Sequence, residues 1–465
     1  MTARDEDFGF LLAGRPARQR RDGTTMVCVY AVITLIVPAR LVISGVSMSI
    51  TPATVTGLVL GLAWFCSQLV TTLNAAKGRN IARTALFVFI ITQLATYGYA
   101  TRNYLPEDEL NSADRTMVTI MGVVLAGLAV VDGVRGIARV ELVAKCVLVA
   151  TTAVAVIGIL QFLLNLDLTQ YLVIPGLHPV TSDGFVLERA AFRRPAGTTG
   201  HPIEFGVVCA VALPIAAHFA FAAQDKGESA RRWWICLTIV ATGAMVSLSR
   251  SAMLGLGLAS VVLLIGWPGK RRVRAFFAGL AFLVLMRFLV PGLLGTLYGL
   301  FAEIGTDTSI SGRTDDYATS SVYIAQHPLL GRGLGTYLPN KYGPLDNQYL
   351  GTLVQNGFIG LFALIAIFVL GAYAALRART MTRDPHIRDL GLTLVASISV
   401  LALGAATFDL LAFSMATGLV FLLCGLAGAL LRSTRAEQVA AGIDPPTVRV
   451  VLTRAMRLKM GSQLK

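Results

Sequence analysis

The arginines predicted on the outer side of the membrane are informative, because the positive-inside bias acts against them and a buried guanidinium group needs an anionic partner. They are Arg189, Arg193, Arg194, Arg250, Arg287 and Arg313. A guanidinium group binds phosphate oxygens through two parallel N–H bonds, so several of them at one membrane-level cavity predict a site for a diphosphate or another polyanionic head group. For any single arginine, snorkelling or a salt bridge to a nearby carboxylate is an equally good explanation.

Arg250 is the arginine whose position relative to the membrane the sequence defines best. It lies in the stretch 247–251 (Ser-Leu-Ser-Arg-Ser) between two apolar segments. Those segments together have about 35 residues, barely enough for two bilayer crossings, so the turn between them cannot project far from the membrane. Arg250 is therefore predicted at the membrane–water boundary, with Ser249 and Ser251 capping the next helix or donating hydrogen bonds to the same anion.

A second candidate cluster lies in the turn-rich stretch 194–204, which delivers polar side chains to the beginning of an apolar segment. His201 and Glu204 are three residues apart and can face one cavity, where either side chain would serve as a general acid or base. The alternative is that they cap the helix that begins there.

A third cluster follows the glycine-rich stretch 327–335. No βαβ pattern surrounds these glycines, which excludes nucleotide binding and favours a tight, irregular path beside the bundle. Asp346 comes next, at the start of another apolar segment, and is either a catalytic base or a carboxylate favoured by the helix dipole. His327, Asn347 and Tyr349 are the remaining predicted substrate contacts.

The composition shows which elements must position these residues. The chain has 465 residues, of which 55% are hydrophobic and 14% charged, and its mean hydropathy is +0.68. This excludes a soluble enzyme, and apolar blocks of roughly 18–25 residues predict an all-α polytopic membrane bundle. The net charge of +14 resides mostly in short loops, where cytoplasmic retention explains it without nucleic acid.

Apolar windows predict about twelve transmembrane helices within residues 26–431. They are 26–44, 52–73, 83–100, 116–132, 142–164, 203–222, 233–248, 252–267, 275–292, 348–375, 389–408 and 411–431. Each even-numbered span is followed by a basic loop, so the positive-inside rule places the tails 1–25 and 432–465 in the cytoplasm. Two long extracytoplasmic loops, 165–202 and 293–347, are expected to carry short helices over the bundle.

Taken together, the motifs resemble the O-antigen ligase and polymerase superfamily of integral membrane glycosyltransferases. The motifs are Arg-x-x-Gly-Thr-x-x-His-Pro at 194–202, Ser-Arg-Ser at 249–251, Gly-Arg at 312–313, His-Pro-Leu-x-Gly-x-Gly-x-Gly at 327–335 and Asp-Asn-x-Tyr-Leu-x6-Gly-x-x-Gly at 346–360. The resemblance covers about 190–375. It implies a GT-C-like bundle in a bacterial plasma membrane that takes part in building the cell envelope.

The resemblance also implies a reaction. A glycan would pass from a polyprenyl diphosphate carrier to a hydroxyl of a glycan or glycolipid acceptor at the extracytoplasmic face, without cofactor or metal. Arg250 and Arg313 would bind the diphosphate. Ligases of this family usually have His where this chain has Asp346, and Asp-Asn at this place resembles the exopolysaccharide polymerase branch.

Two other functions are compatible with a polytopic bundle. A flippase of the same lipid-linked glycan would show repeated halves, broken helices and charges at the midplane, and the sequence has no convincing repeat. A structural scaffold of envelope assembly would leave the outer arginines unexplained.

Overall fold

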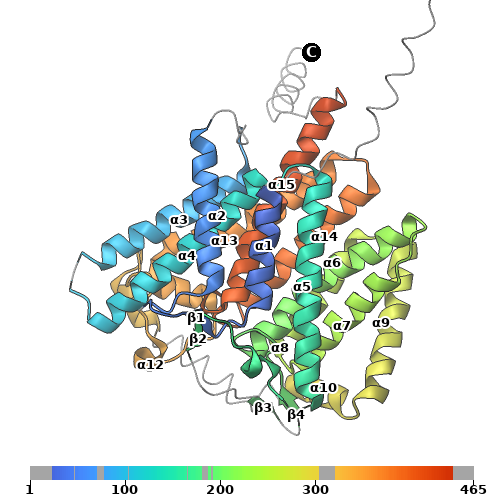
Figure 1. Ribbon diagram of the computed structural model, residues 1–465, viewed down its shortest axis with the longest axis horizontal. Coiled ribbons are helices and arrows are strands. Elements are labelled where there is room, and N and C mark those ends of the chain that lie inside the picture. Colours follow the sequence, from blue (N-terminus) through green and yellow to red (C-terminus); the bar gives the residue numbers. More distant parts are fainter. Residues whose placement is uncertain are drawn as a thin grey trace, which may run out of the picture.

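The computed structural model describes residues 23–46, 48–70, 78–102, 104–164, 166–180, 187–189, 192–302 and 320–442. These residues form an all-α bundle, as predicted, with four strands of three residues each (Figure 1). The long helices are α1 (Gly23–Ile36), α2 (Pro52–Leu69), α3 (Ile81–Ala100), α4 (Glu107–Gly133), α5 (Ile137–Leu164), α6 (Pro202–Asp225), α7 (Arg231–Val246), α8 (Arg250–Gly266), α9 (Gly269–Leu289), α13 (Gln348–Met381), α14 (Pro385–Ala405) and α15 (Ser414–Ala440).

Each of the twelve predicted spans overlaps one of these helices, but the last part of the predicted span 26–44 is not helical: α1 ends at Ile36, and Leu41–Ile43 form strand β1. Among the described residues, eight helices are long and apolar enough to cross a membrane, and a ninth span results if α9 and α10 (Leu293–Ala302), bent by 109°, are taken together. Helices α1 and α8 are shorter apolar helices. Twelve crossings therefore remain a prediction, whereas the helical membrane bundle is confirmed.

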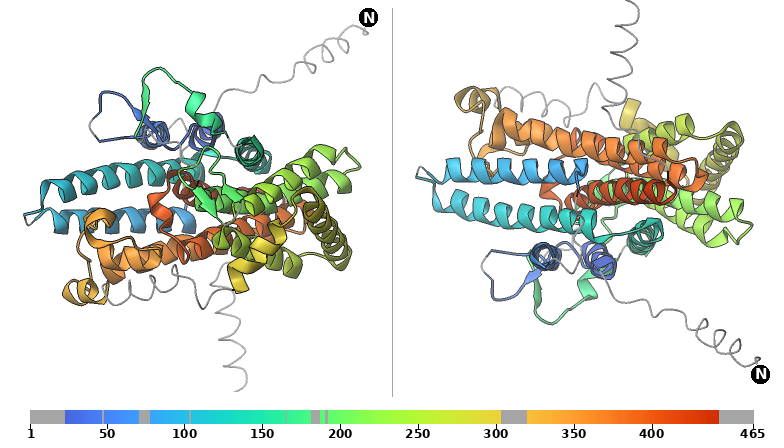
Figure 2. Two further views of the ribbon diagram at one scale, coloured as in Figure 1. Left: turned by 90° about the horizontal axis from the view of Figure 1, so that it is seen from below. Right: turned by 90° about the horizontal axis from the view of Figure 1, so that it is seen from above.

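Helices α6 and α15 lie at the centre of the bundle and are almost entirely buried. Both are rich in Ala and Gly, which lets neighbouring backbones approach closely. At Gly206 in α6, a Cβ atom would overlap the Ser247 hydroxyl, so this glycine allows α6 to pack against the turn between α7 and α8. Figure 2 shows α3 and α4 at one side of the molecule and α6 to α9 at the other, with α13 to α15 between them.

Where the structure describes them, the predicted basic loops lie at one end of the bundle, here called the basic end. Ion pairs join the helices there: Arg83 to Asp132 at 3.3 Å, and Arg271 to Asp389 at 3.0 Å. Asp389 also accepts from the Trp267 indole at 2.9 Å. Because the basic loops share one end, the charge pattern fits a single membrane orientation.

The opposite end, here called the loop end, carries the irregular segments. Strand β1 (Leu41–Ile43) pairs antiparallel with β2 (Leu177–Pro179), and β3 (Leu187–Arg189) pairs antiparallel with β4 (Phe192–Arg194). The short helices here are η3 (Leu168–Tyr171), α10, a helix at 320–326, α12 (Pro339–Tyr342) and η4 (Leu410–Ala412). Short helices were predicted in both long loops, whereas the two strand pairs were not.

Candidate functional site

The turn between α7 and α8 is rigid and holds Arg250 at the loop end. Leu248, fully buried, adopts φ of +48°, a strained conformation for a branched side chain. Ser249 is the N-cap of α8, where its hydroxyl accepts from the Ala252 N–H at 3.5 Å, and Ser251 is buried in the first turn. The Arg250 Nε donates to the Leu300 carbonyl of α10 at 2.6 Å. Of the two predicted roles of the serines, the structure shows capping by Ser249.

Arg194, at the end of β4, lies against the same turn. Its Nε donates to the Ser247 carbonyl at 3.2 Å. Arg194 and Arg250, 56 positions apart in sequence, therefore flank one short turn. Two guanidinium groups in this arrangement can bind one dianionic or polyanionic group.

Two of the other predicted arginines do not join this pair in the described structure. Arg287 is exposed in the last turn of α9 and forms no hydrogen bond or ion pair with any described residue. Its surroundings agree with the snorkelling interpretation. Arg313 lies outside the described residues.

His201 is the N-cap of α6. Its Nδ1 accepts from the Ile203 N–H at 3.2 Å, and its ring lies 6.0 Å from that of Phe413, measured between centroids. With Nδ1 acting as acceptor, the proton of a neutral ring is on Nε2. His201 therefore caps a helix and still presents an N–H donor.

Glu204 has a different environment from the one a general base needs. Its side chain is fully buried, with one oxygen accepting from the Gly200 N–H at 2.9 Å and the other from the Met415 and Ala416 N–H groups at 2.8 and 3.0 Å. The carboxylate thus closes the first turn of its own helix and caps the beginning of α15. This geometry favours the capping interpretation of Glu204 over a catalytic one.

At the start of α13, the residue that caps the helix is the one after Asp346. Asn347 is the N-cap, with its side-chain oxygen accepting from the Tyr349 and Leu350 N–H groups at 3.0 and 3.2 Å. Asp346, one residue earlier, is exposed and forms no hydrogen bond or ion pair with a described residue. The N-cap of α13 is therefore Asn347 and not Asp346, and both the catalytic and the helix-dipole interpretation of Asp346 stay predictions.

Tyr349 turns away from this region. Its hydroxyl donates to the Ala402 carbonyl of α14 at 2.8 Å, and its ring packs against Phe368. This geometry favours a structural role, joining α13 to α14, over direct substrate contact.

Helix α13 is broken beside the glycine-rich segment. Gly357 has φ of +62° and ψ of −166°, and the segment 328–333 supplies the missing hydrogen bonds. The Val354 and Gln355 carbonyls accept from the N–H groups of Arg332 and Gly333 at 2.9 and 2.8 Å, while the Phe358 N–H donates to the Pro328 carbonyl at 2.8 Å. The predicted tight path of these glycines is confirmed, and such irregular backbone is tolerated in a membrane only beside protein or a water-filled cavity.

Two contacts fasten this segment to the bundle. The His327 Nδ1 lies 3.4 Å from the Tyr99 hydroxyl at the end of α3. Arg332 and Lys341 donate to the Glu109 carboxylate of α4 at 2.8 and 2.9 Å. The predicted substrate contact His327 is thus placed at the edge of the site, over α3.

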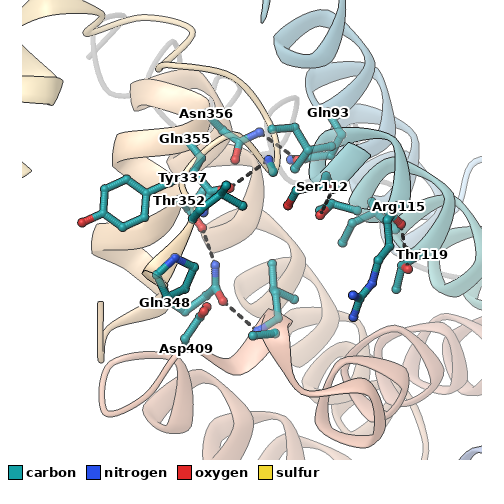
Figure 3. Close-up of a pocket in the computed structure, with 18 of the residues that line it drawn as sticks. Gln93, Ser112, Arg115, Thr119, Tyr337, Gln348, Thr352, Gln355, Asn356 and Asp409 are labelled. Carbon is teal, nitrogen blue, oxygen red and sulfur yellow. Dashed lines mark hydrogen bonds between the residues drawn. The ribbon is translucent and has the colours of Figure 1, made fainter. Parts of the chain in front are cut away.

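A polar cavity of about 630 Å³ opens between α3, α4, α13, η4 and the segment 334–339. Gln348 forms part of its wall and ties α13 to η4, donating to the Thr352 hydroxyl at 2.9 Å and accepting from the Leu411 N–H at 2.7 Å. Figure 3 shows Arg115 of α4 and Asp409 on opposite walls. These are the two charged side chains among the described residues that line the cavity.

Comparison with known proteins agrees with the motifs. Residues 235–365 match the O-antigen ligase family. This O-antigen ligase region contains Arg250, the glycine-rich segment and Asp346, and it confirms the resemblance stated from the sequence. No curated protein matches the chain. The match supports a membrane glycosyltransferase of the O-antigen ligase or polymerase type, a family that acts on lipid-linked glycans.

Electrostatics connect the O-antigen ligase region to residues on either side of it. Burial lowers the pKa of His201 to about 4; the charge of Arg194 acts in the same direction and that of Asp346 opposes it. Burial, with the nearby charge of Asp346, raises the pKa of Asp409 to about 6. His201 is therefore neutral at pH 7. The charge of Asp346 acts both on His201, which also feels the charge of Arg194, and on Asp409 in the wall of the polar cavity.

Sequence reasoning missed Asp409 and Arg115. Asp409 is the one carboxylate in the short link between the last two predicted spans. A single charged residue in a short link between apolar segments is the same signal that marked Arg250. Arg115 directly precedes the predicted span 116–132 on its outer side, and the sequence analysis did not single it out. Among the described residues, no group of three His, Cys, Asp or Glu side chains is arranged to hold a metal ion.

Proposed function

We propose that this protein transfers glycan from a polyprenyl-diphosphate-linked donor to a sugar hydroxyl at the loop end, extending a polysaccharide. The observation that supports the proposal is the placement of two arginines at one short turn of the loop end, together with an exposed carboxylate, Asp346, whose charge acts on His201 and on Asp409 of the polar cavity. Anion recognition and proton acceptance are the two requirements of a displacement at a glycosyl diphosphate.

The donor side consists of Arg194 and Arg250. Their guanidinium groups bind the diphosphate and stabilise the negative charge that grows on it as the bond from the anomeric carbon to the phosphate oxygen breaks. The leaving diphosphate keeps the electron pair of that bond. Arg313, outside the described residues, is the third proposed ligand.

The acceptor side consists of Asp346 and Asp409. The acceptor hydroxyl attacks the anomeric carbon from the face opposite the diphosphate, and its proton passes to the Asp346 carboxylate. Asp409, in the cavity wall, accepts a hydrogen bond from the acceptor sugar and positions it. The neutral His201 donates from Nε2 to an oxygen of the donor.

Chain growth is proposed over single transfer to a glycolipid because Asp-Asn, rather than His, opens α13, and this pattern resembles the polymerase branch. The broken helix α13 is a feature that a flippase would also show. However, the described charged groups of the site gather at one end, and the family match supports transfer rather than transport.

Purified protein in nanodiscs, supplied with a polyprenyl-diphosphate-linked oligosaccharide, tests the proposal. We expect products longer by whole repeat units, strong loss of product with Asp346→Asn, and a donor affinity at least about tenfold weaker with Arg250→Ala. Arg102→Ala, an exposed arginine of the α3–α4 link, is the matched control. Wild-type turnover by Asp346→Asn and Arg250→Ala would contradict the assignment, and products with one added unit would favour ligation.

We further propose that the loop end faces the extracytoplasmic side of the plasma membrane. In a variant without native cysteines, Tyr104→Cys at the loop end should react with an impermeant maleimide in intact cells, and Glu228→Cys at the basic end should react only after lysis. Both side chains are exposed. The reverse labelling pattern would overturn the orientation.

A further inference from the structure

The polar cavity is larger than the placement of one hydroxyl requires. At about 630 Å³ it has the size of a small-molecule site. It extends along α13 from Gln348 to Asn356, eight positions or about 12 Å of helix. Arg194 and Arg250, which are proposed to bind the diphosphate, do not line the cavity. The proposed diphosphate site therefore does not account for what the cavity binds.

The wall of the cavity is rich in amide and hydroxyl groups, and several of them are fixed by hydrogen bonds. Asn356 donates to the Gln93 side chain and to the Thr96 hydroxyl, both at 2.8 Å, and the Gln355 side chain accepts from the Gly335 N–H at 2.8 Å. Other neutral polar residues of the lining are Ser49, Asn111, Ser112, Thr116, Thr119, Tyr337, Gln348 and Thr352. A preformed surface of neutral donors and acceptors suits a ligand with many hydroxyl groups.

Arg115 is the cation of this surface. It lies two turns into α4 and its side chain is exposed at the cavity (Figure 3). Its backbone carbonyl accepts from the Thr119 hydroxyl at 2.9 Å, whereas its guanidinium group forms no hydrogen bond or ion pair with a described residue. Asp409 lies on the opposite wall and is not paired with it. A guanidinium group that has no ionic partner among the described residues, in a cavity otherwise lined by neutral groups and one carboxylate on the opposite wall, is arranged to receive an anionic group of the ligand.

The charges of the residues that line the cavity indicate which kind of anion binds at Arg115. With Asp409 ionised, the described lining has one positive and one negative charge. A monoanion bound at Arg115 neutralises the guanidinium, whereas a dianionic phosphate would add uncompensated negative charge in a cavity that already holds Asp409. The balance favours a carboxylate over a phosphate.

We propose that the cavity binds an acidic sugar of the glycan, and that Arg115 holds its carboxylate through a two-point contact. The proposal rests on the proposed function, because it takes the ligand to be a glycan. It adds a substrate preference: glycans with a uronic-acid-type unit next to the reacting end bind better than their neutral counterparts.

Binding without transfer tests this preference separately from catalysis. Isothermal titration of the nanodisc-held protein would use a panel of uronic-acid oligosaccharides, each paired with its carboxyl-reduced, neutral counterpart. We expect at least one acidic member to bind about tenfold or more tightly than its neutral partner, and Arg115→Gln to abolish this difference. Arg115→Lys should restore it only partly, because the planar fork is lost.

The control is Arg102→Gln, which removes an exposed arginine outside the cavity lining and should keep the preference. Equal affinities for every acidic and neutral pair in the wild-type protein would overturn the proposal, as would an acidic preference that survives in Arg115→Gln. Arg115-dependent binding of a short-chain polyprenyl diphosphate without any acidic-sugar preference would reassign the arginine to the donor.

The failure of this proposal and that of the proposed function can be distinguished. An intact acidic preference in a protein that extends no chain would contradict transfer alone. Chain extension at equal rates with acidic and neutral glycans would contradict the role of Arg115 alone.

Discussion

The pH dependence of transfer is the sharpest test of the acceptor side. Asp409 has its pKa raised from the ordinary 3.8 to about 6, first by burial and then by the charge of Asp346. If the ionised carboxylate positions the acceptor, kcat/KM should fall as the pH drops through about 6. The neighbouring His201, with its pKa lowered to about 4, would give a limb two units lower.

The magnitude follows from the titration. With a pKa of about 6, Asp409 is ionised in roughly nine molecules of ten at pH 7 and in one of ten at pH 5, so kcat/KM should fall by about ninefold over that interval. Asp346→Asn removes one cause of the raised pKa, so any residual transfer by that variant should show its acid limb at lower pH. Asp409→Asn should abolish the limb near pH 6 and lower the plateau.

Stability provides an independent measurement of the same group. Because the folded pKa is above the ordinary value, the native state binds the proton more tightly than the unfolded chain, and stability falls as the pH rises from about 4 to about 6. The cost above pH 6 is about 3 kcal/mol at most. Asp409→Asn should therefore raise the thermal midpoint at pH 7.5 and leave it unchanged at pH 4.

Initial rates measured from pH 4.5 to 8.5 with a saturating donor, alongside intrinsic-fluorescence melts of the same preparations, provide both profiles. A flat wild-type rate between pH 5 and 7 would refute the role of Asp409. So would an acid limb near pH 6 that persists unchanged in Asp409→Asn. A limb near pH 4 that is lost in a His201 variant would transfer the role to the imidazole.

Three further predictions concern the framework of the site, and thermal unfolding in detergent measures each. Glu204→Gln should destabilise the protein by about 3 kcal/mol, because two helix beginnings lose a charged acceptor, and an unchanged midpoint would argue against the capping role. Gly357→Ala should cost about 1–3 kcal/mol or more, because a Cβ atom there meets backbone at positive φ, whereas Gly351→Ala in the same helix has open space and should be neutral or stabilising. Asn347→Ala should cost about 1 kcal/mol as a lost N-cap, with Asp346→Ala neutral; equal losses would mean that both cap the helix.

The helical layout could be predicted from the sequence because apolar length and basic loops are local signals. All twelve predicted spans have a helix, and the basic loops share one end. The strand pairs could not be predicted in this way. Strands β1 and β2 each have three residues and come from segments more than 130 positions apart, so no local alternation marks them.

The sequence predicted features of the site only where neighbouring residues in the chain determine them. The turn at Arg250 was predictable because its two flanking helices are short, and the capping alternative for Glu204 could be stated because the carboxylate lies three residues after a turn. The choice between capping and catalysis required tertiary contacts: the beginning of α15, 211 residues away, decides it for Glu204. At Asp346, the structure shows that the next residue, Asn347, is the cap, and the catalytic role of Asp346 stays a prediction.

The cavity shows why the acceptor side was the harder half to predict. Arg115 and Asp409 come from helices and links almost 300 residues apart, and each lies in a segment whose charge has an ordinary explanation by itself. The glycine-rich segment, which supplies hydrogen bonds at the break in α13, also contributes Leu334 and Gly335 to the wall of the cavity that both charges face. The glycines that look like a binding motif in the sequence thus act indirectly: they shape the cavity, and the charges that face it come from elsewhere in the chain.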